Sequence, residues 1–321
     1  MGTAEIDSAL QTPVALLVFN RPETTRQIFA AVARARPTHL LIIADGPRPD
    51  HPADLARCAE VRQIVSQVDW PCTVQTNYAE VNLGHAGVVR ARSGFKWLFE
   101  CVEEAIILED DVLPHPSFFR FCAELLERYR DNPQIAQICG SNYHYKPTRD
   151  RASYHFSRYA NICGWATWRR AWQHYDGDLT DWAASESRDQ QLQLFSKRGE
   201  RQFWEYTWRR LDSQQLYAWD YQWILACLRY QLLTIKPNVN LISNIGYGPD
   251  ATHTTGRSIL ANLPRQPMQF PLVHPAAIHP DSPKDRYMQE LLYTKRSLAG
   301  RIAYKIKREL LFMTRHLAKD G

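Results

Sequence analysis

Ala105-Ile106-Ile107-Leu108-Glu109-Asp110-Asp111 joins a short apolar run to three consecutive carboxylates. The apolar run predicts a buried strand, and the acids follow where that strand leaves the sheet. Carboxylates in such a place repel one another and resist desolvation. A divalent cation removes that cost, and a phosphate-bearing ligand gives the cation a role. An acidic loop or a helix N-cap after the strand is the alternative interpretation.

Apolar runs alternate with amphipathic segments on the N-terminal side of these acids. The expected elements are, in chain order, a strand at 13–19, a helix at 22–35, a strand at 39–44, a helix at 55–68 and a strand at 72–76. This alternation predicts a largely parallel α/β sheet. Ligands of such sheets bind beyond the carboxyl ends of the strands. Asn20, Arg21 and Asp45 are expected there, beside the three acids.

A turn at Asn82-Leu83-Gly84 and Gly87 precedes a helix that is expected to reach about residue 100 and carries Arg90. A helix N-terminus with a nearby arginine suits phosphate binding. A plain loop-to-helix junction explains the pattern equally well. After the acids we expect a helix at 116–130, with its apolar face in the core, and a buried strand at 135–139.

The chain after residue 145 is rich in polar turns and aromatic residues. Its expected elements are a helix entered at 164–172, helices at 190–197, 200–211 and 219–230, strands at 232–235 and 239–242, and an extended Pro-rich segment at 266–284. Aromatic density suits a sugar-binding cleft, although core packing is the default for any single ring. Asp220 opens a helix behind Trp219, where N-capping is the alternative to a catalytic role. The Gly-rich loop 244–254 is of the kind that closes over ligands.

The composition describes a chain that can bury a large core, with 321 residues and 45% hydrophobic content. A formal net charge of +5 is too modest to indicate a nucleic-acid partner. Seven scattered Cys residues show neither metal-ligand spacing nor a disulfide framework, which favours reduced thiols and a cytoplasmic protein. No apolar run reaches transmembrane length, and the first residues lack a signal-peptide pattern.

Together these motifs resemble the nucleotide-sugar-dependent glycosyltransferases of the GT-A fold. The nearest group is a bacterial family of predicted sugar transferases, and the N-acetylglucosaminyltransferase I family is a more distant one. The segments that carry the resemblance span roughly residues 13–256 and are VFNRP (18–22), ADGPR (44–48), NLG (82–84), ILEDDVLPHPSFF (107–119), GWATW (164–168), AWDYQW (218–223) and NIGYGPDATHT (244–254). The resemblance implies a Rossmann-like, mostly parallel central sheet flanked by helices, with an aromatic-rich acceptor-side half.

The resemblance also implies roles for particular residues. Asp111 would bind the metal ion, Mn²⁺ or Mg²⁺, and His253 would be a further metal ligand or phosphate contact in a loop that orders over the diphosphate. Asp220, which matches the acidic residue after Trp in the distant family, would be the catalytic base. The nucleotide-sugar-binding residues would be Asn20, Arg21, Asp45, Arg90, Glu109, Asp110, Trp165, Trp219 and Tyr247. Of these, Glu109 and Asp110 would hold the ribose and metal-bound waters.

The implied activity is inverting transfer of a hexosyl or N-acetylhexosaminyl group from a nucleotide diphosphate-sugar, foremost a UDP-sugar, in polysaccharide biosynthesis. The acceptor would be a hydroxyl of a glycan or a lipid-linked saccharide. The catalytic domain would cover 1–256, with a nucleotide-binding half at 13–145 and an acceptor half at 146–256. The distant family is membrane-anchored, and this sequence shows no such anchor, so the acceptor of that family is not carried over.

Two alternatives come from other functional classes. One is a sugar-phosphate nucleotidyltransferase, although Asn20-Arg21-Pro22 stands where a Gly-rich phosphate loop would follow the first strand. The other is a non-catalytic glycan-binding protein, although the acidic segment and Asp220 are both intact.

The C-terminal region, 257–321, is expected to hold the extended segment and a basic amphipathic helix. The apolar positions of that helix are Leu298, Ile302, Ile306, Leu310, Met313 and Leu317. Such a stripe packs on the body of the enzyme or on a second subunit in a homodimer. The alternative is a helix that lies on an anionic membrane surface, which would make the protein peripheral on the inner membrane.

Overall fold

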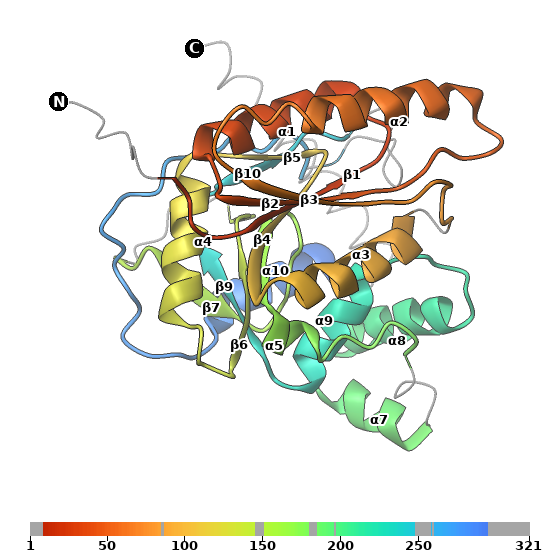
Figure 1. Cartoon of the computed structure of the whole chain (residues 1–321). Coiled ribbons are helices and arrows are strands. Elements are labelled where there is room, and N and C mark those ends of the chain that lie inside the picture. Colours follow the sequence, from red (N-terminus) through yellow and green to blue (C-terminus); the bar gives the residue numbers. More distant parts are fainter. Residues whose placement is uncertain are drawn as a thin grey trace, which may run out of the picture.

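An eight-stranded sheet forms the centre of the computed structural model, and helices lie on both of its faces (Figure 1). The structure describes residues 9–84, 87–144, 151–179, 185–195, 197–247, 258 and 260–294. The strands are β1 (Val14–Val18), β2 (His39–Ala44), β3 (Thr73–Tyr78), β4 (Glu104–Glu109), β5 (Val112–Pro114), β6 (Ile135–Cys139), β7 (Tyr154–Ser157), β8 (Trp165–Trp168), β9 (Leu233–Pro237) and β10 (Ile242–Asn244). The helices are α1 (Pro22–Ala35), α2 (Pro52–Val65), α3 (Val88–Cys101), α4 (Ser117–Arg128), α5 (Arg169–Trp172), α7 (Ser185–Gln193), α8 (Arg198–Asp212), α9 (Asp220–Arg229) and α10 (Ser282–Leu292).

The order of strands across the sheet is β3-β2-β1-β4-β8-β6-β9-β7. Strands β3, β2, β1 and β4 pair in parallel, as do β6 and β9. Strand β8 runs antiparallel to both β4 and β6, and β7 runs antiparallel to β9. Six of the eight strands therefore point the same way. The predicted α/β fold with a mostly parallel central sheet flanked by helices is confirmed.

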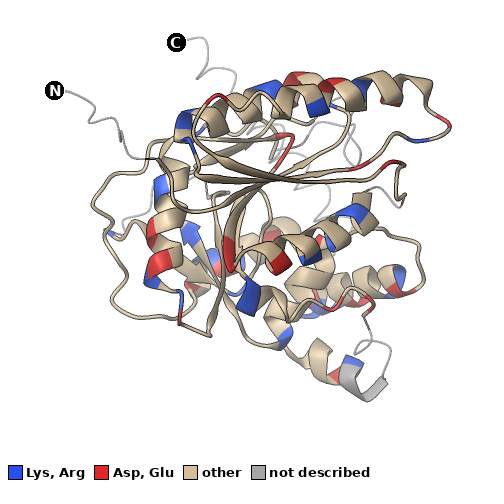
Figure 2. Cartoon of the chain, viewed as in Figure 1, with Lys and Arg blue, Asp and Glu red and all other residues tan. Residues whose placement is uncertain are grey.

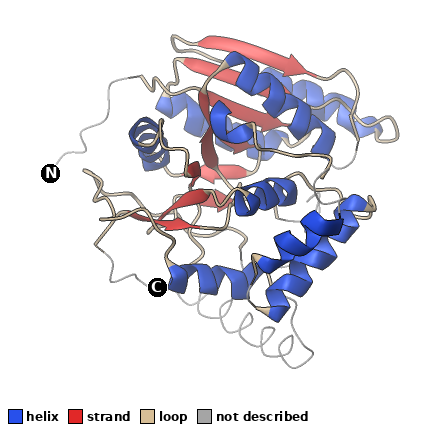
Figure 3. Ribbon diagram, turned by 90° about the horizontal axis from the view of Figure 1, so that it is seen from below, coloured by secondary structure: helices blue, strands red, loops and turns tan. Residues whose placement is uncertain are grey.

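Alternate residues of the central strands belong to two core layers. Leu16 and Ile42 pack in the layer that contains the buried faces of α1, α2 and α4. Ala15 and Leu41 pack in the other layer, which contains those of α3, α8 and α9. Figure 3 shows the sheet between these helices from a second direction. Strands that are buried on both faces are apolar throughout, which explains the continuous apolar runs in the sequence.

Strand β8 is the largest difference from the sequence prediction. The sequence predicts a helix entry at 164–172, but Trp165–Trp168 form a strand in the interior of the sheet and only Arg169–Trp172 are helical. All four strand residues are buried, so the segment has no polar–apolar alternation that would mark it as a strand. Aromatic and β-branched side chains favour the extended conformation there.

Three further elements have no counterpart in the sequence prediction. Strand β5 pairs with β10 in a separate two-stranded sheet. Strand β7 adds to the sheet beside β9. Helix α10 begins at Ser282, inside the segment that the sequence predicts to be extended as far as residue 284. Asp281 explains this start, because its Oδ1 accepts a hydrogen bond from the Lys284 backbone N–H at 3.0 Å and caps the helix.

Basic and acidic side chains are interspersed on the described helices, and α1 and α2 both carry the two signs (Figure 2). Within the described ranges no helix has the length and the apolar character that crossing a membrane requires. The amphipathic segment predicted at 297–319 lies outside the described residues. Its packing on the enzyme, its role in a homodimer and its contact with a membrane surface therefore stay predictions.

Helix α3 approaches β2 so closely that the contact has no room for a Cβ atom at Gly94. Such an atom would lie 2.5 Å from Ile43 Cγ2 and 3.2 Å from Ile43 Cδ1. A β-branched side chain is stiff at χ1, so Cγ2 cannot turn away freely. This clash opposes the preference of about 1 kcal/mol that Ala has over Gly inside a helix.

We expect Gly94→Ala to lower the free energy of unfolding by about 1–3 kcal/mol, the usual cost of an overpacked core. Urea denaturation followed by circular dichroism measures this change. Ser93→Ala, at an exposed position of the same helix, is the control and should change the unfolding free energy by less than about 0.5 kcal/mol. A stabilised Gly94→Ala variant would show that α3 is not pressed against β2.

Candidate functional site

Three parallel strands end side by side at the edge of the sheet where the sequence places the candidate residues. The register pairs Val18 of β1 with Ala44 of β2, and Leu17 of β1 with Glu109 of β4. Glu109 is the last residue of β4, and the segments that follow these three strands carry Asn20 and Arg21, Asp45, and Asp110 and Asp111. The prediction that they share the carboxyl edge of the sheet is confirmed.

Arg21, the residue before helix α1, holds the acidic segment. Its Nη1 lies 2.7 Å from Asp111 Oδ2 and 3.2 Å from Asp110 Oδ1. Burial works against the charge on Arg21, but the two carboxylates outweigh burial and raise the pKa of the guanidinium. A guanidinium between two carboxylates offsets part of their mutual repulsion. Arg21 therefore stabilises the acidic strand end.

Asp110 is buried, and Glu109 is partly buried. Asp110 Oδ2 accepts a hydrogen bond from the Phe19 backbone N–H at 3.0 Å. Burial raises the pKa of Asp110, and the charge of Arg21 opposes that rise. Burial also raises the pKa of Glu109 well above its usual range, and repulsion from Asp111, Asp110 and Asp220 adds to the effect. The negative charge at this site is therefore costly, and a bound cation would lower the cost.

The segment after β10 lies against Asp111. Because β10 pairs with β5, Asn244 stands opposite Val112, and the Ile245 backbone N–H donates to the Asp111 carbonyl at 2.8 Å. A Cβ atom on Gly246 would collide with the Asp111 carboxylate, so only glycine fits there.

Tyr247 follows in the same segment. Burial raises the pKa of its phenol, and the charge of Asp111 is among the further causes, so the two groups lie near each other. Residues 248–257, with His253, lie outside the described residues. The predicted closure of this loop over a diphosphate and the metal-binding role of His253 stay predictions.

Asp220 is the first residue of α9, and the N-cap position of this helix belongs to Trp219. The alternative role of Asp220 is N-capping, but the N-cap position of α9 is occupied by its neighbour Trp219. The charge of Asp220 reaches Glu109, where it adds to burial and to the other acids in raising the pKa of that carboxyl. The fold thus brings the candidate base on α9 to the acidic strand end.

Trp165 and Trp219 lie in the aromatic part of the core. Trp165 is fully buried, and its ring centroid lies 5.9 Å from that of Phe95 and 6.0 Å from that of Trp219. Trp219 is also buried and contacts Phe95 at 5.0 Å. These contacts give both rings a packing role that places the start of α9, and their predicted contact with the nucleotide-sugar stays a prediction.

Asp45 and Arg90 each bond to a neighbouring loop or strand end. Asp45 Oδ1 accepts hydrogen bonds from the backbone N–H groups of Gly46 at 2.9 Å and Leu83 at 3.1 Å. Arg90 donates to both the carbonyl and the side-chain oxygen of Asn77, near the end of β3. The two residues therefore fix the shape of the sheet edge, and their predicted contacts with the nucleoside and the phosphates stay predictions.

Asp54 and Arg48 are residues of the site that sequence reasoning missed. Asn20 Nδ2 donates to Asp54 Oδ1 at 2.7 Å, and Arg48 Nε donates to Asp54 Oδ2 at 2.6 Å. Asp54, in the first turn of α2, thus ties the end of β1 to the loop after β2. Arg48 belongs to the ADGPR segment and so could have been found. An acid in the first turn of a helix is common and gives no such signal.

A metal ion in this site would be bound by oxygen ligands. Carboxylate oxygens suit Mn²⁺ and Mg²⁺. In the part of the chain that the structure describes, no three His, Cys, Asp or Glu side chains are grouped so that they could hold a metal. Mg²⁺ commonly binds one or two carboxylates together with substrate phosphates and waters. A cation that arrives with a diphosphate needs few protein ligands, and the metal-binding role of Asp111 stays a prediction.

We expect the contribution of Asp54 to stability to disappear in acid. The hydrogen bond from Arg48 lowers the pKa of Asp54 from 3.8 to about 2, against the effect of burial. A carboxyl group with a depressed folded-state pKa stabilises the fold above its unfolded-state pKa, and this contribution is lost as the pH falls through the folded-state value. Asp54→Asn should therefore lower the unfolding free energy by about 1–2 kcal/mol at pH 7, and the difference should shrink between about pH 4 and pH 2.

Urea denaturation at pH 7, 4 and 2.5 measures this difference. Asp69→Asn, at an exposed position, is the matched control and should stay within about 0.5 kcal/mol of wild type throughout. A difference for Asp54→Asn that does not change with pH would contradict the role given to its charge.

No protein-family model matches the sequence, and no curated protein matches it. Among solved structures, one similar chain is the crystal structure of UDP-glucose pyrophosphorylase complexed with UDP-glucose, with a TM-score of 0.23 and 10% sequence identity. The match covers 43% of this chain and 65% of that chain, so this chain spans less than two thirds of the length of that structure. A similarity of this degree carries no conclusion about the ligand of this protein.

Proposed function

We propose that the protein is a metal-dependent, inverting glycosyltransferase of the GT-A type, with a nucleotide diphosphate-sugar as donor and a UDP-sugar as the first candidate. One observation carries the proposal: Trp219, the residue before Asp220, packs on Trp165 at 6.0 Å between ring centroids, and Trp165 pairs in the sheet with Ile107, two residues before Glu109. The charge of Asp220 accordingly adds to burial and to the neighbouring acids in raising the pKa of Glu109. A glycosyltransferase needs a diphosphate-binding site and a general base that face the same sugar. The two sets of acids come from distant segments, and the fold brings them together.

In this proposal the acidic strand end binds the donor. Asp111 is the best-placed metal ligand, because its side chain is 16% exposed whereas that of Asp110 is 8% exposed. A cation bound there stabilises the negative charge that develops on the leaving nucleoside diphosphate. Arg21 supplies a second positive charge at the same place. Glu109 and Asp110 would hold the ribose and the waters of a bound metal ion.

Asp220 acts on the acceptor. A sugar hydroxyl has a pKa far above neutral, and it gains nucleophilicity when a carboxylate accepts its proton. The hydroxyl oxygen attacks the anomeric carbon from the face opposite the diphosphate, and the bond to the diphosphate oxygen breaks as the new bond forms. A single displacement of this kind inverts the anomeric centre.

The proposal divides the chain into a nucleotide-binding half at 13–145 and an acceptor half at 146–256. The acceptor is a glycan or a lipid-linked saccharide. The alternative is a sugar-phosphate nucleotidyltransferase. The connection from β1 to α1 is only residues 19–21 and contains no glycine, which speaks against a phosphate loop there. Pyrophosphate release from a nucleoside triphosphate and a sugar 1-phosphate would establish the alternative.

We expect Asp111→Asn to remove metal-dependent donor binding while the fold stays intact, because the amide keeps the size of the side chain and loses the charge. Calorimetry with a UDP-sugar and Mn²⁺ should show a loss of affinity of at least about tenfold, the value of one charge-assisted contact. Asp131→Asn, an exposed acid beyond α4, is the control and should bind as wild type does. Normal donor and Mn²⁺ binding by Asp111→Asn would remove the basis for the metal site.

We expect Asp220→Asn to bind the donor normally and to lose turnover. General base catalysis contributes about 10²–10⁴-fold, so kcat should fall by that factor while the donor Kd is unchanged. Proton NMR of the product of the wild-type enzyme reports the anomeric configuration. A variant that keeps the wild-type kcat, or a product with retained configuration, would rule out this role for Asp220.

A further inference from the structure

An open groove of about 510 Å³ lies along helix α8. Its lining residues are Phe203, Tyr206, Thr207 and Arg210 of α8, with Leu216 and Tyr221. A volume in this range is typical of small-molecule sites. None of these lining residues belongs to the candidate donor site.

The α8 residues of the groove form a stripe beside the buried face of that helix. Phe203, Tyr206 and Arg210 follow one another at helical spacing, while Trp204 and Trp208, on the adjacent stripe, are fully buried in the core. Tyr206 is 55% exposed, which is unusual for so large an aromatic side chain. The groove therefore offers aromatic surface to solvent on a helix that the core holds firmly.

Arg210 keeps the walls of the groove in place. Its guanidinium lies over the Tyr206 ring, 5.5 Å from the centroid. Its Nη2 donates to the Gln215 carbonyl at 2.9 Å, and its own carbonyl accepts from the Leu216 backbone N–H at 3.0 Å. The aromatic surface is thus held in shape before any ligand binds, which lowers the entropic cost of binding.

One end of the groove lies against the start of α9. Tyr221 lines the groove and follows Asp220 directly in α9. The Phe203 ring lies 6.5 Å from that of Tyr221 and 5.9 Å from that of Tyr293. Burial raises the pKa of both tyrosines, and the charge of Asp220 adds to the rise. A ligand in the groove would therefore have one end near the candidate base.

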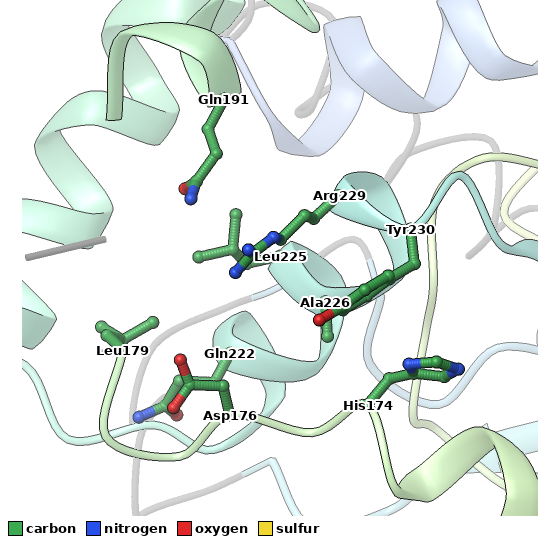
Figure 4. Close-up of a pocket in the computed structure, with 9 residues that line it drawn as sticks. All are labelled: His174, Asp176, Leu179, Gln191, Gln222, Leu225, Ala226, Arg229 and Tyr230. Atoms are coloured by element: carbon green, nitrogen blue, oxygen red, sulfur yellow. The ribbon is translucent and has the colours of Figure 1, made fainter. Parts of the chain in front are cut away.

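A second hollow also borders α9 but is too small for this role (Figure 4). It is lined by nine residues and encloses only about 20 Å³, which is room for about one water molecule. Gln222, Leu225, Ala226 and Arg229 line it. At 100° per residue these positions are on the face of α9 opposite Asp220.

We propose that the groove along α8 binds the saccharide of the acceptor, with a sugar ring stacked on Tyr206 and Tyr221. The C–H face of a pyranose is apolar and buries well against an aromatic ring, while its hydroxyl groups stay available for hydrogen bonds. An acceptor seated this way places its terminal hydroxyl at Asp220. This inference rests on the proposed glycosyltransferase function, which gives Asp220 its task.

Saturation-transfer NMR tests the groove with chitotetraose, cellotetraose, maltotetraose and mannotetraose as probes, with no donor present. The wild-type chain should bind at least one of them. Tyr206→Ala should weaken that binding by at least about tenfold, whereas Tyr206→Phe, which keeps the ring, should stay within about twofold. Tyr230→Ala is the matched control, because Tyr230 is 46% exposed and lies outside the groove.

Donor binding, measured separately by calorimetry with a UDP-sugar and Mn²⁺, should be the same in Tyr206→Ala and wild type. If the wild-type chain binds the donor but none of the saccharides, the inference about the groove is overturned and the proposed function is not. If it binds a saccharide but no donor, the proposed function is overturned and saccharide binding in the groove is not. Equal saccharide binding by Tyr206→Ala and wild type would overturn the inference. So would light scattering that shows a wild-type dimer and a Tyr206→Ala monomer, because the groove would then be an interface between two copies.

Discussion

Arg21 contacts both Asp110 and Asp111, and the candidate site depends on this pair of contacts. Three adjacent acids at the end of a buried strand would repel one another strongly in a medium of low dielectric constant. A guanidinium that stands before the first turn of α1 supplies the opposing charge from within the protein. The same contacts fix the start of α1 against the end of β4. Electrostatic compensation and the geometry of the sheet edge therefore come from one side chain.

The rest of the sheet edge is held by side chains that bond to loops. Asp54 connects Asn20 with Arg48, and Asp45 holds the backbone at Gly46 and Leu83. A site that is assembled from strand-end loops needs such bonds, because loops have few core contacts of their own. Residues that the sequence suggests as ligand contacts can thus have a second task, which is to keep the site in shape.

The sequence predicted the parallel strands and their shared edge because continuous apolar runs and amphipathic helices are local signals. It did not predict β8, since Trp165-Ala166-Thr167-Trp168 is buried on both sides and lacks alternation. The approach of Asp220 to Glu109 also has no local signal: it depends on how α9 packs against the sheet. Asp54 was missed for the same reason, because its partners Asn20 and Arg48 come from other segments. Local pattern identified the acids, and only tertiary structure shows which of them meet.

The aromatic residues of the second half divide into two groups with different tasks. Trp165, Trp219 and Trp223 are buried against one another or against Phe95, and they anchor α9 to the sheet so that its first residue lies near the acids. Their burial gives these rings a packing role, and this role accounts for much of the aromatic content of the second half. Tyr206 is different, because it is more exposed than buried and stands in a groove that reaches Tyr221, the residue after Asp220. The rings that the core leaves uncovered are therefore the ones with a face available for stacking on an acceptor sugar.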